Sequence, residues 1–170
     1  MNAWYAILVA LLLGSCALTK PEAEAPNDQS AQADNPSQAA DSTRPVTTIA
    51  QARVLWKQSQ IKSYNFSQQR HCFCRREYTR PIAVVVKDGS IISATYEDSG
   101  LPVSNGVRKT VRTIGDWLDY IATRQLNDPY EFEAIFHPQH GYPIRYNVDQ
   151  REGVADDTEE VMFRSFSALP

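Results

Sequence analysis

The strongest constraint on the fold is a series of helix and strand signals that occurs twice between residues 47 and 170. Each occurrence opens with Thr-Ile and has an acceptor side chain three residues after the Thr, at Thr48–Gln51 and at Thr113–Asp116. This spacing is typical of the capping box that begins a helix. Apolar residues then recur at helical spacing, regularly in the second segment (Ile114, Trp117, Leu118, Ile121) and less so in the first (Ile49, Ala52, Leu55, Trp56). The pattern predicts two amphipathic helices.

Each predicted helix is followed by segments in which apolar and polar residues alternate, as in half-buried strands. The first strand of each set begins Tyr-x-Phe, at 64–66 and 130–132, and later strands are joined by turns at 87–89 and 152–153. Matching Thr-Ile, Tyr-x-Phe and Pro-Ile pairs lie 65, 66 and 62 residues apart, which suggests a duplicated α-β-β-β unit, although matches this short also arise by coincidence. Both interpretations predict an α+β fold, with an antiparallel sheet and two helices packed on one face.

Residues 1–15 have the pattern of a signal peptide. Trp4–Leu13 is a run of ten apolar residues, whereas a membrane-spanning helix needs roughly 20. The run ends in Leu13-Gly14-Ser15-Cys16, which resembles the lipobox of bacterial lipoproteins. The resemblance implies cleavage before Cys16 and acylation of this cysteine. Because Ala17 rather than an aspartate follows, it also implies an outer-membrane lipoprotein that faces the periplasm. The alternative is an ordinary secretory signal that contains a cysteine by coincidence.

Residues 16–46 are predicted to form the lipidated cysteine and a disordered tether. Residues 17–46 contain seven Ala and four Pro but no aromatic residue and no Gly. Such a segment cannot bury enough apolar surface to offset the entropy lost on ordering. A flexible chain of this length spans on the order of 30 Å. The remaining residues, 47–170, are numerous enough for a single domain with its own core.

Charge and motif content argue against several function classes. The tether carries two basic and five acidic residues, so the domain has equal numbers of each sign. A neutral domain without a basic stripe does not predict nucleic-acid binding. The sequence has no phosphate loop, no nucleophile elbow and no zinc-protease motif, so we expect no cofactor and no enzymatic activity.

Several motifs together resemble a known family. The domain contains Tyr64-x-Phe66, Cys72-Phe73-Cys74, a strand from Pro81 that ends at Asp88-Gly89, Gly141-Tyr142-Pro143, Asp149 and Asp156-Asp157-Thr158-Glu159. This set resembles a bacterial envelope family catalogued as domain of unknown function 6174. The resemblance spans nearly the whole domain and implies a fold and a setting without implying a reaction.

Cys72 and Cys74 are the only cysteines besides Cys16. In an oxidising compartment such a pair is expected to form a disulfide. Residues i and i+2 of a regular strand lie about 6.6 Å apart with parallel side chains, so the chain must bulge or turn to join them. Counting alternately from Tyr64 and Phe66 places both cysteines on the core face, provided that the strand is uninterrupted. The first interpretation is therefore a disulfide at a strand end, or two packed thiols.

Two other interpretations of the cysteine pair remain open. A redox pair would use basic neighbours to lower a thiol pKa, and the candidates are Arg70, His71, Arg75 and Arg76. A zinc or copper site would combine Cys72 and Cys74 with His137 and His140, or with His71 in place of one of these histidines. Its intervals, one residue between the cysteines and two between the histidines, are shorter than in usual zinc sites. Residues 137–140 are otherwise expected to form a solvated turn.

The acidic run at 156–160, together with Asp149, is a further candidate site. It lacks the spacing of an EF-hand calcium loop, so a solvated hairpin loop is the favoured interpretation. The combined features predict a lipid-anchored, non-enzymatic module of the cell envelope. It would bind a protein or an envelope polymer through a sheet face or through the loop at 137–143. The alternative is a redox or metal-binding protein that acts through Cys72 and Cys74.

Overall fold

The computed structural model describes residues 46, 48–154 and 156–170. The predicted signal peptide, Cys16 and the predicted tether up to residue 45 lie outside the described residues, so the structure does not bear on them. Within the described part of the chain, no helix is both long and apolar enough to cross a bilayer.

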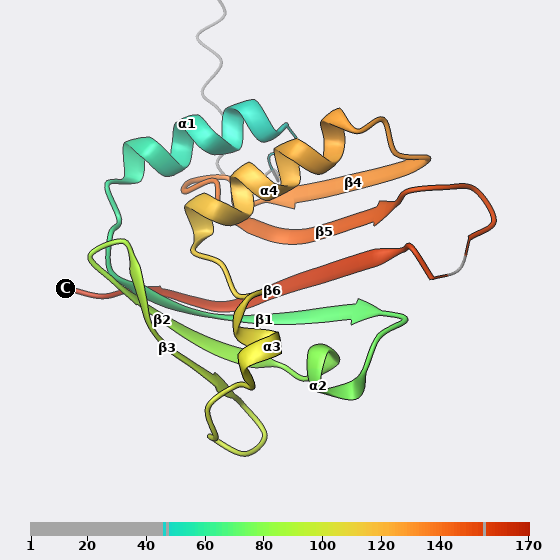
Figure 1. Ribbon diagram of the computed structural model, residues 1–170. Helices are drawn as coiled ribbons and strands as arrows, with labels where there is room; N and C mark the ends of the chain where they lie inside the picture. Colours follow the sequence, from blue (N-terminus) through green and yellow to red (C-terminus); the bar gives the residue numbers. More distant parts are fainter. Residues whose placement is uncertain (1–45, 47, 155) are drawn as a thin grey trace, which may run out of the picture. The chain divides into compact units, whose positions relative to one another are not determined.

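A six-stranded antiparallel sheet forms the centre of the fold (Figure 1), with the strand order β3-β2-β1-β6-β5-β4. This architecture confirms the predicted α+β class. The elements in chain order are α1 (Ile49–Ser59), β1 (Tyr64–Cys72), α2 (Arg76–Thr79), β2 (Ile82–Lys87), β3 (Ser90–Tyr96), α3 (Asn105–Arg108), α4 (Ile114–Leu126), β4 (Glu131–Phe136), β5 (Pro143–Asp149) and β6 (Glu159–Ala168).

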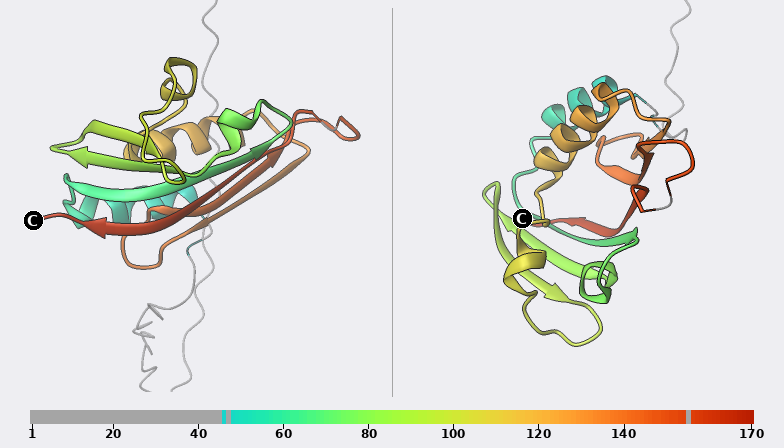
Figure 2. Two further views of the ribbon diagram at one scale, coloured as in Figure 1. Left: turned by 90° about the horizontal axis from the view of Figure 1, so that it is seen from below. Right: turned by 45° about the vertical axis from the view of Figure 1, so that its right-hand side comes forward.

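The two long helices, α1 and α4, lie side by side on one face of this sheet (Figures 1 and 2). Trp117 in α4 is fully buried, and its indole Nε1 donates to Gln68 Oε1 of β1 at 2.9 Å. The predicted stripe of α4 is buried throughout, whereas only Ala52 of the α1 stripe is. The core therefore lies between the helices and the inner face of the sheet.

Both predicted helix starts are correct, but only one has a capping box. Thr113 Oγ1 accepts from the backbone N–H of Asp116, whose carboxylate in turn accepts from the backbone N–H of Thr113. At α1, the Thr48 hydroxyl donates to Gln51 Oε1 at 2.6 Å and makes no bond to the backbone. Helix α1 therefore begins without a side-chain cap on its backbone N–H groups.

The predicted hairpin at 87–89 is present between β2 and β3. Lys87 pairs with Ser90, which leaves Asp88 and Gly89 as a two-residue turn with φ values of 50° and 77°. Positive φ at both positions is the conformation that matches the twist of the flanking strands, and Asp-Gly adopts it readily.

The α-β-β-β order occurs in both halves, as the sequence predicts, with α2 and α3 as short additions. Across the sheet, the strands of the first half lie in the order β3-β2-β1 and those of the second half in the order β6-β5-β4. Corresponding strands of the two halves therefore have the same lateral order but run in opposite directions. A rotation that reverses strand direction and keeps this lateral order also turns the sheet over, which would place the helices on opposite faces. Since both helices lie on one face, the repeat of elements does not extend to a repeat in space.

Val46 belongs to the folded part of the chain. It pairs with Phe136 at the edge of β4, where the two residues exchange backbone hydrogen bonds of 3.2 and 2.8 Å. This pairing covers one end of an edge strand that would otherwise expose its backbone groups.

Candidate functional site

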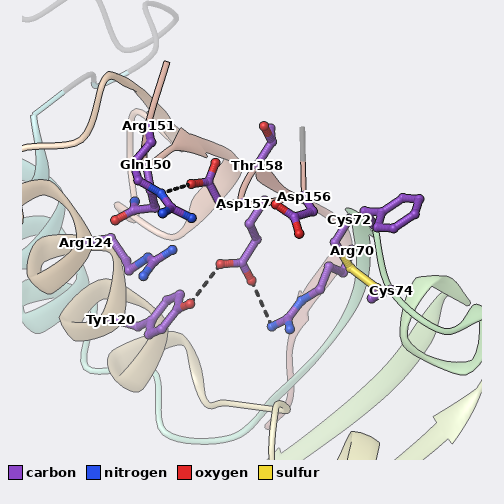
Figure 3. Close-up of a pocket in the computed structure, with 12 residues that line it drawn as sticks. Arg70, Cys72, Cys74, Tyr120, Arg124, Gln150, Arg151, Asp156, Asp157 and Thr158 are labelled. Atoms are coloured by element: carbon purple, nitrogen blue, oxygen red, sulfur yellow. Dashed lines mark hydrogen bonds and ion pairs between the residues drawn. A yellow bond between two sulfur atoms is a disulfide. The ribbon is translucent and has the colours of Figure 1, made fainter. Parts of the chain in front are cut away.

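A groove lies at the end of the sheet where β1 finishes and β6 begins (Figure 3). It has a volume of about 670 Å³, within the range of ligand-binding pockets. Its lining comes from the end of β1, from α4 and from the β5–β6 loop. The lining residues are Arg70, Cys72, Phe73, Cys74, Tyr120, Arg124, Gln150, Arg151, Asp156, Asp157, Thr158 and Glu159.

A buried carboxylate forms the floor of the groove. Glu159 is only 9% exposed, and its Oε2 accepts a hydrogen bond from the Tyr120 hydroxyl at 2.8 Å. Arg70 Nη2 lies 3.1 Å from Glu159 Oε1, an ion pair whose angles fall outside those of a hydrogen bond. Burial, followed by the charge of Glu159, raises the pKa of Tyr120. The phenol therefore stays protonated and donates to the carboxylate.

Local folding explains why these three side chains meet. Alternation along β1 places Arg70 on the helix-covered face, as it does Tyr64 and Phe66, and pairing with β6 brings Glu159 opposite Cys72. Tyr120 lies three residues after Trp117 and therefore on the flank of the buried stripe of α4.

A second charged pair lies in the β5–β6 loop. Arg151 Nε donates to Asp157 Oδ2 at 2.7 Å, and the Asp157 side chain is only 16% exposed. Elsewhere along this segment, Asp149 accepts from the backbone N–H of Arg151 and Glu160 pairs with Arg145 at 2.7 Å. Most acids of the predicted run are thus bound to arginines or to the backbone, and no group of three or more potential metal ligands gathers among the described residues.

Three buried side-chain atoms in the described part of the chain have no hydrogen-bond partner, and all three belong to residues that line the groove. Two are acceptors, Asp157 Oδ1 and Glu159 Oε1, and one is a donor, Gln150 Nε2. Buried polar groups are nearly always hydrogen-bonded in folded proteins. All three thus lie just beneath one groove, and one of them, Glu159 Oε1, is also in the ion pair with Arg70.

Cys72 and Cys74 form a disulfide at the rim of this groove. Strand β1 ends at Cys72, and the chain turns so that the Cα atoms lie 5.3 Å apart. The predicted placement on the core face fails for Cys74, because β1 ends at Cys72 and the condition of an uninterrupted strand is not met. Cys72 is half-buried and Cys74 is exposed, while Phe73 between them is 86% exposed.

The structure does not bring His137 and His140 to the cysteines. The two imidazoles stack on each other, and His137 stacks on Tyr142, which in turn stacks on Phe166 beside Tyr64. Tyr64 begins β1 and Cys72 ends it, so the two groups are separated by roughly 26 Å of strand. The predicted four-ligand metal set is therefore not assembled. The turn is also packed rather than solvated, since both histidines are half-buried.

Sequence reasoning missed the groove residues outside the cysteine and acidic motifs. Tyr120 and Arg124 lie four residues apart on one flank of α4, a polar flank that helical spacing could have revealed. Gln150 gave no signal, because only the path of the β5–β6 loop places it here. Figure 3 shows Tyr120, Arg124 and Gln150 on one side of the groove, with Arg70 and the disulfide on the other.

Comparison with known protein families shows which family this chain belongs to. Residues 48–168 match the model of a family described only as a family of unknown function, DUF6174. No match was found among curated proteins or among solved structures. The match covers all ten helices and strands of the described fold. The bridge at Val46 lies just outside it. The chain therefore belongs to the family of unknown function DUF6174, as its motifs indicated.

Proposed function

We propose that this chain is a lipid-anchored binding protein of the bacterial cell envelope. In this proposal Cys16 carries the lipid that holds it to the outer membrane, and residues 17–45 tether the domain in the periplasm. The domain binds an envelope component without transforming it. The binding site is the groove rather than the sheet face or the loop at 137–143 that the sequence alone suggested.

The observation that carries this proposal is a groove of about 670 Å³ that gathers basic and acidic side chains from three parts of the chain, with the exposed ring of Phe73 in its lining. The carboxylates beside them favour binding over catalysis. Glu159 is held by Arg70 and Tyr120, and Asp157 by Arg151. Carboxylates that are already engaged by side chains of the domain are poorly placed to exchange a proton with a ligand.

Photochemical crosslinking in intact cells tests the binding site. A benzophenone amino acid replaces Thr158 in the groove or, as a control, Lys87, which is exposed at the opposite end of the sheet. We expect irradiation to produce a discrete adduct from position 158 and none from position 87. Equal adducts at both positions, or none at either, would reject the groove as the binding site.

Fractionation tests the anchor separately. We expect Cys16→Ala to release the protein from the outer-membrane fraction, because one change removes the acylated thiol. A variant that stays in that fraction would exclude lipidation at this residue and leave the groove proposal standing.

Thiol exchange is the second candidate function, and the exposure of Cys74 at the groove rim favours it. A thiolate of a dithiol substrate would attack Sγ of Cys74, Cys72 would leave as a thiolate, and the second substrate thiol would release the oxidised product. Titration of free thiols after mild reduction of the native protein separates the two functions. A structural disulfide yields thiols only after denaturation, whereas an exchange pair yields them in the native protein.

A further inference from the structure

We propose that the groove binds a glycan, that is, an uncharged, polyhydroxylated chain. This inference rests on the proposed function and names the ligand class for the same groove. Three properties of the groove support it: its charge balance, its mixture of hydrogen-bond donors and acceptors, and the aromatic ring at its rim.

The charges of the groove compensate one another before any ligand is bound. Arg70 pairs with Glu159, and Arg151 pairs with Asp157. Of the two other ionisable residues that carry charge in the lining, Arg124 is basic and Asp156 is acidic. A ligand with a strong net charge would meet as many like charges as opposite ones, so this site favours a neutral ligand.

The lining combines hydrogen-bond donors with acceptors. Arg124, Arg151 and Gln150 carry N–H groups, and Asp156, Asp157 and Thr158 carry oxygens that accept. A hydroxyl provides one donor and two acceptor lone pairs and rotates to suit its neighbours. An extended peptide would instead require a row of backbone groups at a sheet edge, and this groove is lined by side chains.

Phe73 supplies an apolar surface at the rim. Its ring is 86% exposed, and the disulfide between its two neighbours holds its backbone in a closed turn. The C–H face of a sugar ring can pack on such an aromatic face while its hydroxyls reach the polar floor. Since the backbone of Phe73 is constrained before binding, little backbone entropy is lost when a ligand covers the ring.

Calorimetric titration of the full chain in detergent tests the ligand class, with chitin, starch and laminarin oligosaccharides as probes. We expect saturable binding of at least one probe. Phe73→Ala should weaken this binding about tenfold, and Gln150→Ala should weaken it about fivefold. The matched control is Ile92→Ala, which removes another exposed apolar side chain, 60% exposed on β3 and outside the groove lining.

Salt provides a second readout. Affinity for a neutral glycan should change less than about twofold between about 0.1 M and 1 M salt, because screening acts on charged ligands. Failure of every probe to bind, binding that falls steeply with salt, or an unchanged affinity in Phe73→Ala would each overturn the inference.

The crosslinked adduct at position 158 separates this inference from the proposed function. One result supports both the binding function and the glycan inference: glycan-degrading enzymes shorten the adduct, and protease digestion leaves it attached to a peptide of this chain. An adduct with a second protein overturns the glycan inference and leaves the binding function in place. The absence of any adduct at position 158 rejects the binding function itself.

Discussion

The two ends of strand β1 lie in contrasting surroundings. At the Tyr64 end, aromatic rings from four parts of the chain pack against one another: Trp56, Tyr64, Tyr142 and Phe166. Tyr64 is 2% exposed, and its hydroxyl accepts the backbone N–H of Ile114 at 2.8 Å. Burial raises the pKa of Tyr64 to about 12. Polar groups at this end are thus bound within the chain.

At the Cys72 end, the chain leaves polar atoms without partners and an aromatic ring in solvent. Glu159 and Asp157 each have one buried oxygen that accepts no hydrogen bond, and Phe73 is almost fully exposed. The same sheet therefore has a closed end, which contributes stability, and an open end, which offers groups to a ligand. Substitutions at the closed end should affect folding, and substitutions at the open end should affect binding.

Gly141→Ala is expected to have the largest effect on stability. Gly141 lies in the turn between β4 and β5 with φ +69°, and an added Cβ would lie 2.1 Å from the carbonyl oxygen of Ala52 in α1. Backbone strain and overpacking together should cost about 3 kcal/mol or more. Urea unfolding of both proteins measures the difference.

Gly153→Ala is the matched control at the open end. Gly153 has a similar φ of +73°, but no atom lies within 4 Å of the added Cβ. Only the conformational cost remains, about 1–2 kcal/mol. Equal losses of unfolding free energy in the two variants would mean that the turn at Gly141 is not packed against α1.

Tyr64→Phe should have the next largest effect. The change removes the hydroxyl that accepts the backbone N–H of Ile114 at the start of α4 and leaves this buried donor unpaired. The expected loss is about 1–2 kcal/mol in urea unfolding. Tyr130→Phe removes a hydroxyl that donates to Glu152 at 3.2 Å in an exposed position, and it should change stability by less than about 0.5 kcal/mol. A loss in Tyr130→Phe as large as in Tyr64→Phe would contradict this contrast.

Removal of the disulfide should affect stability less than either change at the closed end. The ring spans three residues and constrains the unfolded chain little, so its loop-closure contribution lies well below the roughly 3 kcal/mol of a 15-residue loop. Cys74 is exposed and Cys72 is half-buried, so serine hydroxyls would remain accessible to water. We expect both double variants, to Ala and to Ser, to lose less than about 1 kcal/mol.

The crosslinking yield at position 158 should fall in both double variants, because Phe73 is no longer held at the rim. If the double Ser variant were much less stable than the double Ala variant, both cysteines would have to lie on the core face, as the strand pattern suggested. An unchanged crosslinking yield would show that the disulfide does not contribute to the open end.

The helix and strand faces that form the closed end were largely predictable from the sequence, but the packing of the turn at 137–140 and the open end were not. Alternation from Tyr64 and helical spacing around Trp117 each report on a single buried face, which local patterns record directly. The groove depends on β1 and β6 being neighbours, although their residues are about 90 positions apart along the chain. No local pattern specifies that pairing. Counting alternate residues from Tyr64 also failed at Cys74, because alternation does not indicate where a strand ends.

Acid should weaken the closed end through His137, with the smallest effect of this series. The turn at residues 137–142 packs under α1, and His137 Nδ1 accepts the backbone N–H groups of Gln139 and His140 at 3.3 Å each. Burial, followed by the nearby charge of His140, lowers the pKa of His137. The folded protein thus binds this proton less readily than the unfolded chain, whose histidines titrate near pH 6.5. The stability contributed by neutral His137 is present above that pH and is lost as the pH falls through the lowered pKa.

His137→Asn isolates this effect. An asparagine Oδ1 can accept the same backbone N–H groups in an Asx-type turn, and it does not titrate. Urea midpoints measured between about pH 7 and pH 5 should therefore decline more steeply in the natural protein than in the variant, and every other titratable group is common to both proteins. The sign follows from the depressed pKa, because a raised pKa would make acid stabilise the turn. Parallel declines in the two proteins would mean that His137 does not carry the acid sensitivity, and the closed end would then owe its stability to the aromatic packing alone.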